Sequence, residues 1–376
     1  MKYRADIDGL RAIAVIPVVL YHAGLFRISG GYTGVDVFFV ISGYLITTIV
    51  VDEIAKGQFS LISFYERRAR RILPALMTVL IASLLMGWFI LLPSEMKSLG
   101  QSAFATAFFL SNVYFSLTLD YFDLSAEFSP LLHTWSLAVE EQFYLFFPPL
   151  LMFLAWRNWH RPLLVVSILS LASLGAAQAF LISKPEWTFY LIPFRMWELG
   201  AGAVLALASF QIPQSRILRE LIASVALAAV LGSYLILDAA TPFPGVAALP
   251  AVLGAVVIIW IGAPGGGSTV NSVLSHRSLV WVGLISYSLY LWHWPVLAFI
   301  RVSLDSAILP TATSVAAVAV SIIFGWLSYR YVERPFRSQS RGMGARFIFI
   351  SSALSLAAVS AAGLVLHKTN GFPSRL

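Results

Sequence analysis

The chain has 376 residues, of which 59% are hydrophobic and only 11% are charged. This composition excludes a soluble globular protein and predicts an all-α, polytopic membrane helix bundle. Cysteine is absent, which excludes disulfides, cysteine–zinc sites and a thiolate nucleophile, and we expect no metal site. The net charge of +7 is better explained by basic residues that flank the membrane than by a nucleic-acid partner.

Apolar runs predict about eleven transmembrane helices. They cover residues 10–26, 35–51, 73–92, 141–156, 162–182, 188–208, 218–237, 246–262, 279–300, 311–330 and 346–366. The first run has no long basic leader and no small-residue cleavage site, so we expect it to be retained. Residues 100–117 are interrupted by polar side chains, and we expect this segment to lie at the surface or to re-enter rather than to cross.

Charge decides the orientation. With the N-terminus inside, 18 of the 25 lysines and arginines fall in inner segments, 6 fall in outer segments and Arg195 lies in a span. Basic residues concentrate on the cytoplasmic side, so we expect the N-terminus in and the C-terminus out. Counting 100–117 as a span would move the basic loops after Trp156, Phe210 and Tyr331 outside.

The first span contains two ionisable residues, Arg11 and His22. Eleven helical steps place them on one face, about 16 Å apart along the axis. An ionisable residue inside a span is costly and marks function by default. His22 is a candidate general base, since a neutral imidazole accepts a proton near pH 7. The alternative is a histidine that only hydrogen-bonds between helices.

Asp36 lies near the outer end of the second span. A buried carboxylate needs a cation or a donor, and Asp36 could orient the His22 imidazole as the acid of a catalytic triad does. Alternatively, it is a charge at a helix N-terminus that the dipole stabilises.

Four arginines occupy positions 67, 68, 70 and 71, on the inner side just before Pro74. Such a cluster sets topology or binds anionic lipids, or it holds phosphate, which guanidinium binds bidentately. If the segment is helical, Arg68 and Arg71 share a face, and so do Arg67 and Arg70.

The remaining candidates fall in the outer half. Arg195 and Glu198 are i, i+3 neighbours in the sixth span, either as a structural pair or near the reaction. His133 and Glu140 open the fourth span, where Ser136 could cap the helix and the dipole explains the carboxylate equally well.

Tyr290 and His293 lie in the ninth span, between tryptophans typical of a membrane interface. His293 falls beyond the midplane, towards the outside. Arg195 and Tyr290 are candidate donors to a thioester oxyanion.

Six motifs in one order resemble the type 3 acyltransferase family, the integral-membrane O-acyltransferases of bacterial surface polysaccharides. The resemblance covers about Arg4 to Arg337. The motifs are Ile7-Asp8-Gly9-Leu10-Arg11-Ala12 with His22, the stretch from Gly34 to Ile46, the arginine run before Pro74, the stretch from His133 to Tyr144, the stretch from Ser286 to Pro295, and Val332-Glu333-Arg334-Pro335-Phe336.

The resemblance implies acetyl transfer from acetyl-CoA to a sugar hydroxyl outside the cytoplasm, with no permanently bound cofactor, in the inner membrane of a bacterium. It implies an essential histidine matching His22, an arginine matching Arg11, and an Arg-x-x-Arg motif that Arg68 and Arg71 match best. It divides the chain into an acyltransferase domain, residues 1–340, and a further helix with the start of a linker, residues 341–376. Many relatives continue into an extracytoplasmic SGNH-type domain, and no catalytic set of such a domain is present here.

The sequence leaves two mechanisms and two rival functions open. The acceptor attacks acyl-CoA directly, or a histidine or serine carries the acyl group. A secondary transporter would also bury charges near the midplane, but no internal repeat is found. A non-catalytic component of polysaccharide export would not explain why the arginine cluster accompanies His22.

Overall fold

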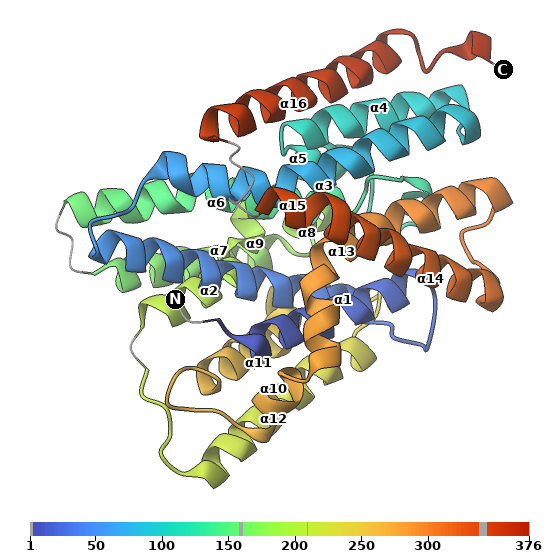
Figure 1. Cartoon of the computed structure of the whole chain (residues 1–376). Coiled ribbons are helices and arrows are strands. Elements are labelled where there is room, and N and C mark those ends of the chain that lie inside the picture. The colour runs from blue at the N-terminus through green and yellow to red at the C-terminus, as the bar shows by residue number, and fades with distance from the viewer. Residues whose placement is uncertain (1–2, 158–160, 209, 338–343, 376) are drawn as a thin grey trace. The chain divides into compact units, whose positions relative to one another are not determined.

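The computed structural model describes residues 3–157, 161–208, 210–337 and 344–375, which form helices and no strands (Figure 1). The longer helices are α1 (Ala5–His22), α2 (Gly34–Ala55), α3 (Leu61–Ile90), α4 (Pro93–Ala107), α6 (Thr134–Trp156), α7 (Pro162–Phe180), α9 (Ile192–Leu207), α10 (Arg216–Ile236), α11 (Leu249–Ile261), α13 (Arg277–Leu304), α14 (Thr311–Leu327) and α16 (Ala345–Lys368). The shorter ones are η1 (Gly31–Thr33), α5 (Ser111–Thr118), η2 (Leu124–Phe128), α8 (Pro185–Tyr190), η3 (Gly245–Ala248), α12 (Thr269–Leu274), η4 (Ser328–Glu333), α15 (Arg334–Arg337) and η6 (Pro373–Arg375).

Eight helices in the described residues are long and apolar enough to cross a membrane, so the protein is an all-α multi-pass membrane protein. The other three predicted spans are helical too. Helix α1 begins five residues earlier than expected and therefore includes Asp6 and Asp8 besides Arg11. Helices α9 and α11 are shorter than a full span of about 20 residues. The number of crossings stays a prediction.

Several helix boundaries differ from the prediction. Helix α3 begins at Leu61, where Ser60 caps it, and it carries the arginine cluster on its early turns. The predicted span 188–208 is divided into α8 and α9 at Leu191, whose backbone is extended (φ −91°, ψ 139°). Pro193 lies in the first turn of α9, where its missing N–H costs no helical hydrogen bond. Segment 100–117 is also divided, into α4 and α5, with Phe109 in the left-handed region at φ 53°.

The chain forms two compact units that alternate along the sequence. The first unit comprises residues 1–59 and 139–286. Within it, α9 packs along α2 and α7, and α10 packs along α11 (Figure 1). Glycine allows the closest approach: a Cβ at Gly43 of α2 would lie 1.8 Å from the Leu199 carbonyl oxygen, and a Cβ at Gly202 of α9 would lie 2.0 Å from that of Val40.

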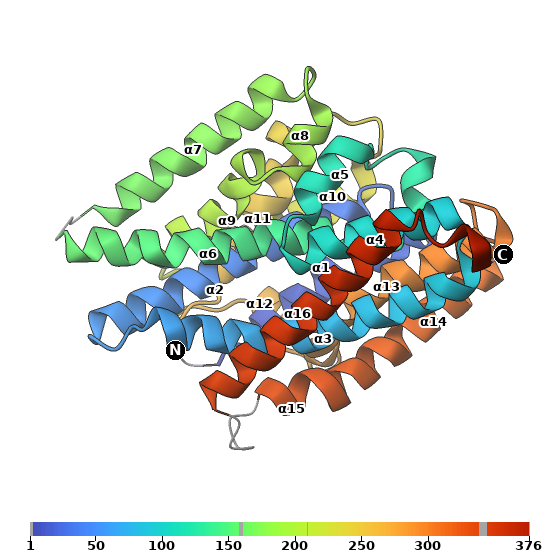
Figure 2. The same ribbon diagram turned by 90° about the horizontal axis from the view of Figure 1, so that it is seen from above.

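The second unit comprises residues 60–138 and 287–376. Helix α16 runs along α4 and also contacts α3 (Figure 2). Lys97 of α4 donates to the side chain of Asn370, and Arg375 binds the backbone carbonyls at the end of α3. The domain boundary predicted between residues 340 and 341 lies outside the described residues.

Cysteine labelling would test the predicted topology, because the chain has no native cysteine. Ser63 and Ser125 are exposed and lie on α3 and η2. The Ser63→Cys protein should react with an impermeant thiol reagent only from the inside, and the Ser125→Cys protein only from the outside. The cysteine-free parent chain is the control. Reaction of both variants from the same side would show that the predicted orientation is wrong.

Candidate active site

A fully buried cluster of charges joins α2 to α9 in the first unit. Nη2 of Arg195 donates to Oδ1 of Asp36 at 3.1 Å and lies 3.3 Å from Oε2 of Glu198. The three side chains are 0–1% exposed. The predicted pairing of Arg195 with Glu198 is therefore present, and Asp36 joins it from 159 residues away.

Aromatic rings enclose the guanidinium of Arg195. Its Cζ lies 5.5 Å from the ring centres of Phe39 and Phe243 and 5.6 Å from that of Phe189. The electron-rich faces of aromatic rings attract a cation, and more strongly where water is absent. The rings and the two carboxylates together compensate for the loss of hydration of Arg195. Arg195 is thus held by two carboxylates and three aromatic rings. Its predicted contact with an oxyanion stays a prediction.

His22 is the last residue of α1 and is only 4% exposed. A chain of rings leads from it towards the charged cluster: His22 to Tyr21 (5.1 Å between centres), Tyr21 to Tyr32 (5.5 Å) and Tyr32 to Phe243 (4.9 Å). Phe243 in turn lies against Arg195. The candidate base and the charged cluster thus share one aromatic environment in the first unit.

The predicted triad-like hydrogen bond between Asp36 and His22 is not formed. Asp36 directs Oδ1 to Arg195, and within the described part of the chain its Oδ2 has no hydrogen-bond partner. The physical reason is charge: a buried carboxylate gains more from a guanidinium at hydrogen-bond distance than from a neutral imidazole.

Tyr32 and Tyr234 are buried residues of this environment that sequence reasoning missed. Both are less than 4% exposed, and the Tyr32 hydroxyl donates to the Asp238 carbonyl oxygen at 2.9 Å. Tyr234 lies near the end of the apolar run of α10, a pattern usual for residues at the membrane interface, and Tyr32 lies in the short turn η1 between glycines, so neither position indicated a site.

Arg11 and Glu140 are both held by side chains of the first unit. Nη1 of Arg11 donates to Asp8 at 3.0 Å, one turn earlier in α1. Glu140 accepts a hydrogen bond of 2.7 Å from the hydroxyl of Ser42 in α2. Helix α6 begins at Thr134, so Glu140 lies in its second turn rather than at its start. The helix dipole therefore explains Glu140 less well than its bond to Ser42 does.

The second unit has its own buried polar cluster. The Tyr290 hydroxyl lies 2.6 Å from Oγ of Ser136 and donates to the carbonyl oxygen of His133 at 3.1 Å. The rings of His133 and His293 are 5.9 Å apart, and both residues are at most 2% exposed. Tyr290 thus contacts the start of α6, and its predicted role as a donor to an oxyanion stays a prediction. Ser136 does not cap α6 as predicted, because the helix begins two residues before it.

The segment between α5 and α6 is held against the part of α13 that belongs to the second unit. Arg301 forms an ion pair of 2.7 Å with Glu127 of η2, and the indole nitrogen of Trp294 donates to the Ser129 carbonyl oxygen at 2.7 Å. Burial raises the pKa of Glu127, and the nearby guanidinium offsets part of this rise. These residues escaped sequence reasoning because Glu127 and Arg301 are 174 positions apart.

The arginines of the cluster, all on α3, have different environments. Arg70 is 4% exposed and donates twice to one carboxylate oxygen of Glu66, at 2.7 and 2.9 Å. The guanidinium of Arg68 lies 5.8 Å from the ring centre of Phe64. Arg70 is thus committed to an internal pair, and Arg68 lies beside an aromatic ring.

The motif Val332-Glu333-Arg334-Pro335-Phe336 begins in a π-helical turn, η4. Glu333 is 1% exposed, accepts a hydrogen bond of 2.8 Å from Ser288 of α13 and pairs with Arg337 at 2.9 Å. π-Helical turns often occur at functional sites, and this one directs a carboxylate to α13. The motif thus has a structural role in joining α13 to the end of α14.

Comparison with known proteins assigns the family. A family model described as an acyltransferase domain matches residues 4–368. The chain is 33% identical over 352 residues to the peptidoglycan O-acetyltransferase OatA of Listeria monocytogenes, covering 89% of this chain and 56% of the relative. It is 32% identical over 352 residues to the O-acetyltransferase OatA of Staphylococcus aureus strain NCTC 8325, covering 90% and 58%. The chain thus spans somewhat less than three fifths of these curated relatives.

No solved structure matches the chain. The motifs quoted above lie within the region that the family model covers, from the first helix to the buried glutamate of η4. The chain belongs to the acyltransferase 3 family.

Proposed function

We propose that this chain is an integral-membrane O-acetyltransferase that acetylates a hydroxyl of a glycan outside the cytoplasm. The observation that carries the proposal is the buried imidazole of His22 at the end of α1, beside the aromatic and charged cluster of Arg195. The family and the OatA relatives support it. We place the protein in the inner membrane of a bacterium, where the acceptor is reached from the outside.

We propose acyl-CoA, supplied from the cytoplasm, as the donor substrate. Its phosphates would bind the guanidinium groups of Arg68 and Arg71, with Arg11 as a further cation. Arg70 would support them from within α3 through its pair with Glu66. A polyanionic donor requires cations close together, and Arg68 and Arg71, three positions apart on α3, share one face of the helix.

We propose that His22 removes the proton from the acceptor hydroxyl as its oxygen attacks the carbonyl carbon of the thioester. The C–S bond breaks, and the thiolate of CoA receives the proton that His22 took. Asp36, Arg195 and Glu198 would fix the helix ends around His22. In the second route, a histidine or serine accepts the acetyl group first, and an acetyl-protein adduct trapped without acceptor would identify it.

An assay with the full chain in lipid nanodiscs separates this proposal from its rivals. An O-acetyltransferase releases CoA from acetyl-CoA and labels a glycan acceptor, whereas a transporter or an export component does neither. An SGNH-type domain, if joined or supplied separately, would be a partner for the last step on the outside. Release of no CoA and labelling of no acceptor, with any acetyl donor, would refute the enzyme.

Replacing both Arg68 and Arg71 by alanine should weaken acyl-CoA binding by about a hundredfold or more, because it removes two charge-assisted contacts that contribute about 1.5–3 kcal/mol each. Acceptor binding should change little. Lysine at both positions should restore binding only in part, since a point charge lacks the planar fork of arginine. Calorimetric titration with CoA measures the effect.

Arg157 follows α6, Arg161 precedes α7, and both are exposed, so they provide the matched control. Their double alanine variant also removes two positive charges, and it should bind CoA as the parent does. Equal affinity of both double variants for CoA would show that the arginine cluster does not bind the donor and only sets the orientation in the membrane.

A further inference from the structure

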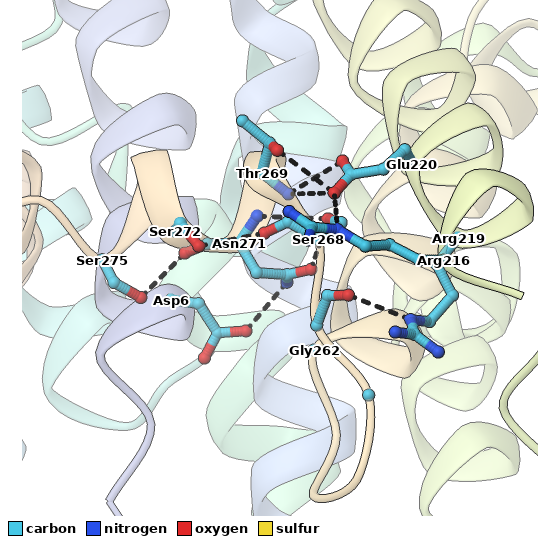
Figure 3. Close-up of a pocket in the computed structure, with 12 residues that line it drawn as sticks. Asp6, Arg216, Arg219, Glu220, Gly262, Ser268, Thr269, Asn271, Ser272 and Ser275 are labelled. Atoms are coloured by element: carbon cyan, nitrogen blue, oxygen red, sulfur yellow. Dashed lines mark hydrogen bonds and ion pairs between the residues drawn. The ribbon is translucent and has the colours of Figure 1, made fainter. Parts of the chain in front are cut away.

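A polar cavity of about 690 Å³ opens in the first unit, among the first residues of α1 and α10, the end of α11 and helix α12 (Figure 3). Its lining consists of charged, hydroxyl, amide and glycine residues: Asp6, Arg216, Arg219, Glu220, Gly262, Gly266, Gly267, Ser268, Thr269, Asn271, Ser272 and Ser275. None of these residues belongs to the candidate active site. All of them lie in segments that the charge pattern places on the inner side.

Hydrogen bonds between the lining residues and neighbouring loops, here called the framework, hold the cavity in shape. Arg219 donates to the carbonyl oxygens of Pro213, Gln214 and Gly267, which ties the loop before α10 to the glycine-rich loop before α12. The carboxylate of Glu220 accepts from the backbone and the hydroxyl of Thr269, at 2.9–3.1 Å. The polar lining is therefore positioned before any ligand arrives.

Asn271 completes the framework on the α1 side. Its side-chain nitrogen donates to Asp6 at 3.0 Å and to the Ile258 carbonyl oxygen at 3.1 Å. The cavity is thus closed at its base by hydrogen bonds between α1, α11 and α12.

The arginines at the cavity outnumber its carboxylates by one. Asp6 is neutralised by Arg4 at 2.6 Å, and Glu220 lies 3.7 Å from Arg216. Arg219 donates to carbonyl oxygens rather than to a carboxylate. These three arginines thus face two carboxylates, and the side chain of Arg216 is 82% exposed and able to turn towards an anion.

The surface beside the cavity is apolar. Ile217, Leu221 and Val225 follow one face of α10 at intervals of four residues and are 82%, 60% and 61% exposed. They start at the residue after Arg216, which lines the cavity. A molecule that satisfies both surfaces has an anionic, hydroxyl-bearing head and hydrocarbon chains that run along α10.

We propose that this cavity binds the headgroup of an anionic phospholipid of the inner leaflet. The phosphate contacts Arg216, the hydroxyls of the headgroup contact Ser272 and Ser275, and the acyl chains cover Ile217 and Leu221. Basic pockets between helices at the cytoplasmic side of a membrane are suited to such headgroups. A soluble phosphate would satisfy the cavity but would leave the apolar face of α10 unused.

The test measures lipid binding to the full chain in detergent by native mass spectrometry. The parent should bind phosphatidylglycerol at least about tenfold more tightly than phosphatidylcholine. Arg216→Ala should remove most of that preference, because one charge-assisted contact corresponds to about a tenfold change in affinity. Arg216→Lys should retain part of it. Since Arg216 is exposed, neither variant should affect folding.

Arg277→Ala is the matched control, because Arg277 is an exposed arginine on the same side that does not line the cavity. It should bind phosphatidylglycerol as the parent does. Equal binding of the two lipids by the parent, or an unchanged preference in Arg216→Ala, would overturn the proposal. Binding of soluble glycerol phosphate as tightly as phosphatidylglycerol would overturn the assignment to a lipid.

Discussion

Replacing His22 by alanine should lower acetyl transfer by at least about a hundredfold, since general acid–base catalysis contributes about 10²–10⁴ to a rate. His22 ends α1, so the loss of its side chain removes one buried group without interrupting a helix. Affinity for CoA should stay within about twofold of the parent, because the proposed phosphate contacts lie on other residues. Steady-state transfer and CoA titration on the same preparation separate the two effects.

His276→Ala is the matched control for His22→Ala. His276 is an exposed histidine in the first unit, between α12 and α13. This variant should transfer acetyl groups as the parent does. If His22→Ala kept near-normal activity, the imidazole would be a helix-packing group and another base would be required.

Replacing Arg195 by methionine should destabilise the folded protein by about 3–5 kcal/mol, because it leaves the carboxylates of Asp36 and Glu198 buried without a cation. Lysine should rescue little, since a single ammonium group cannot reproduce the geometry of the guanidinium among three aromatic rings. Thermal unfolding in detergent, followed by the loss of monodisperse protein, measures the effect.

A compensated variant separates stability from catalysis at this cluster. Arg195→Met combined with Asp36→Asn and Glu198→Gln removes the buried charges together and should recover much of the lost stability. Its transfer rate should remain low if the cluster positions His22. Full recovery of the rate along with stability would show that the cluster serves the fold alone. An unfolding temperature of Arg195→Met equal to that of the parent would contradict the buried ion pair itself.

The helices, and the contacts between residues of one helix, could be predicted from the sequence. Apolar runs marked helices because each must bury or cover its side chains over about 20 residues, and all eleven predicted runs contain one. The pair of Arg195 and Glu198 followed from i, i+3 spacing on one helix. The position of Arg11 and His22 on one face of α1 could be predicted from the 3.6-residue period of the helix.

Tertiary structure decided which helices meet, and therefore which charges pair. Asp36 was predicted to orient the imidazole of His22. The close approach of α2 and α9 at Gly43 and Gly202 instead places it at hydrogen-bond distance from Arg195. Ser42 and Glu140, like Glu127 and Arg301, come together from about a hundred or more positions apart. Helical periodicity tells which face a side chain occupies and carries no information on the partner of that face. Only packing, which selects the helices whose small residues allow contact, supplies it.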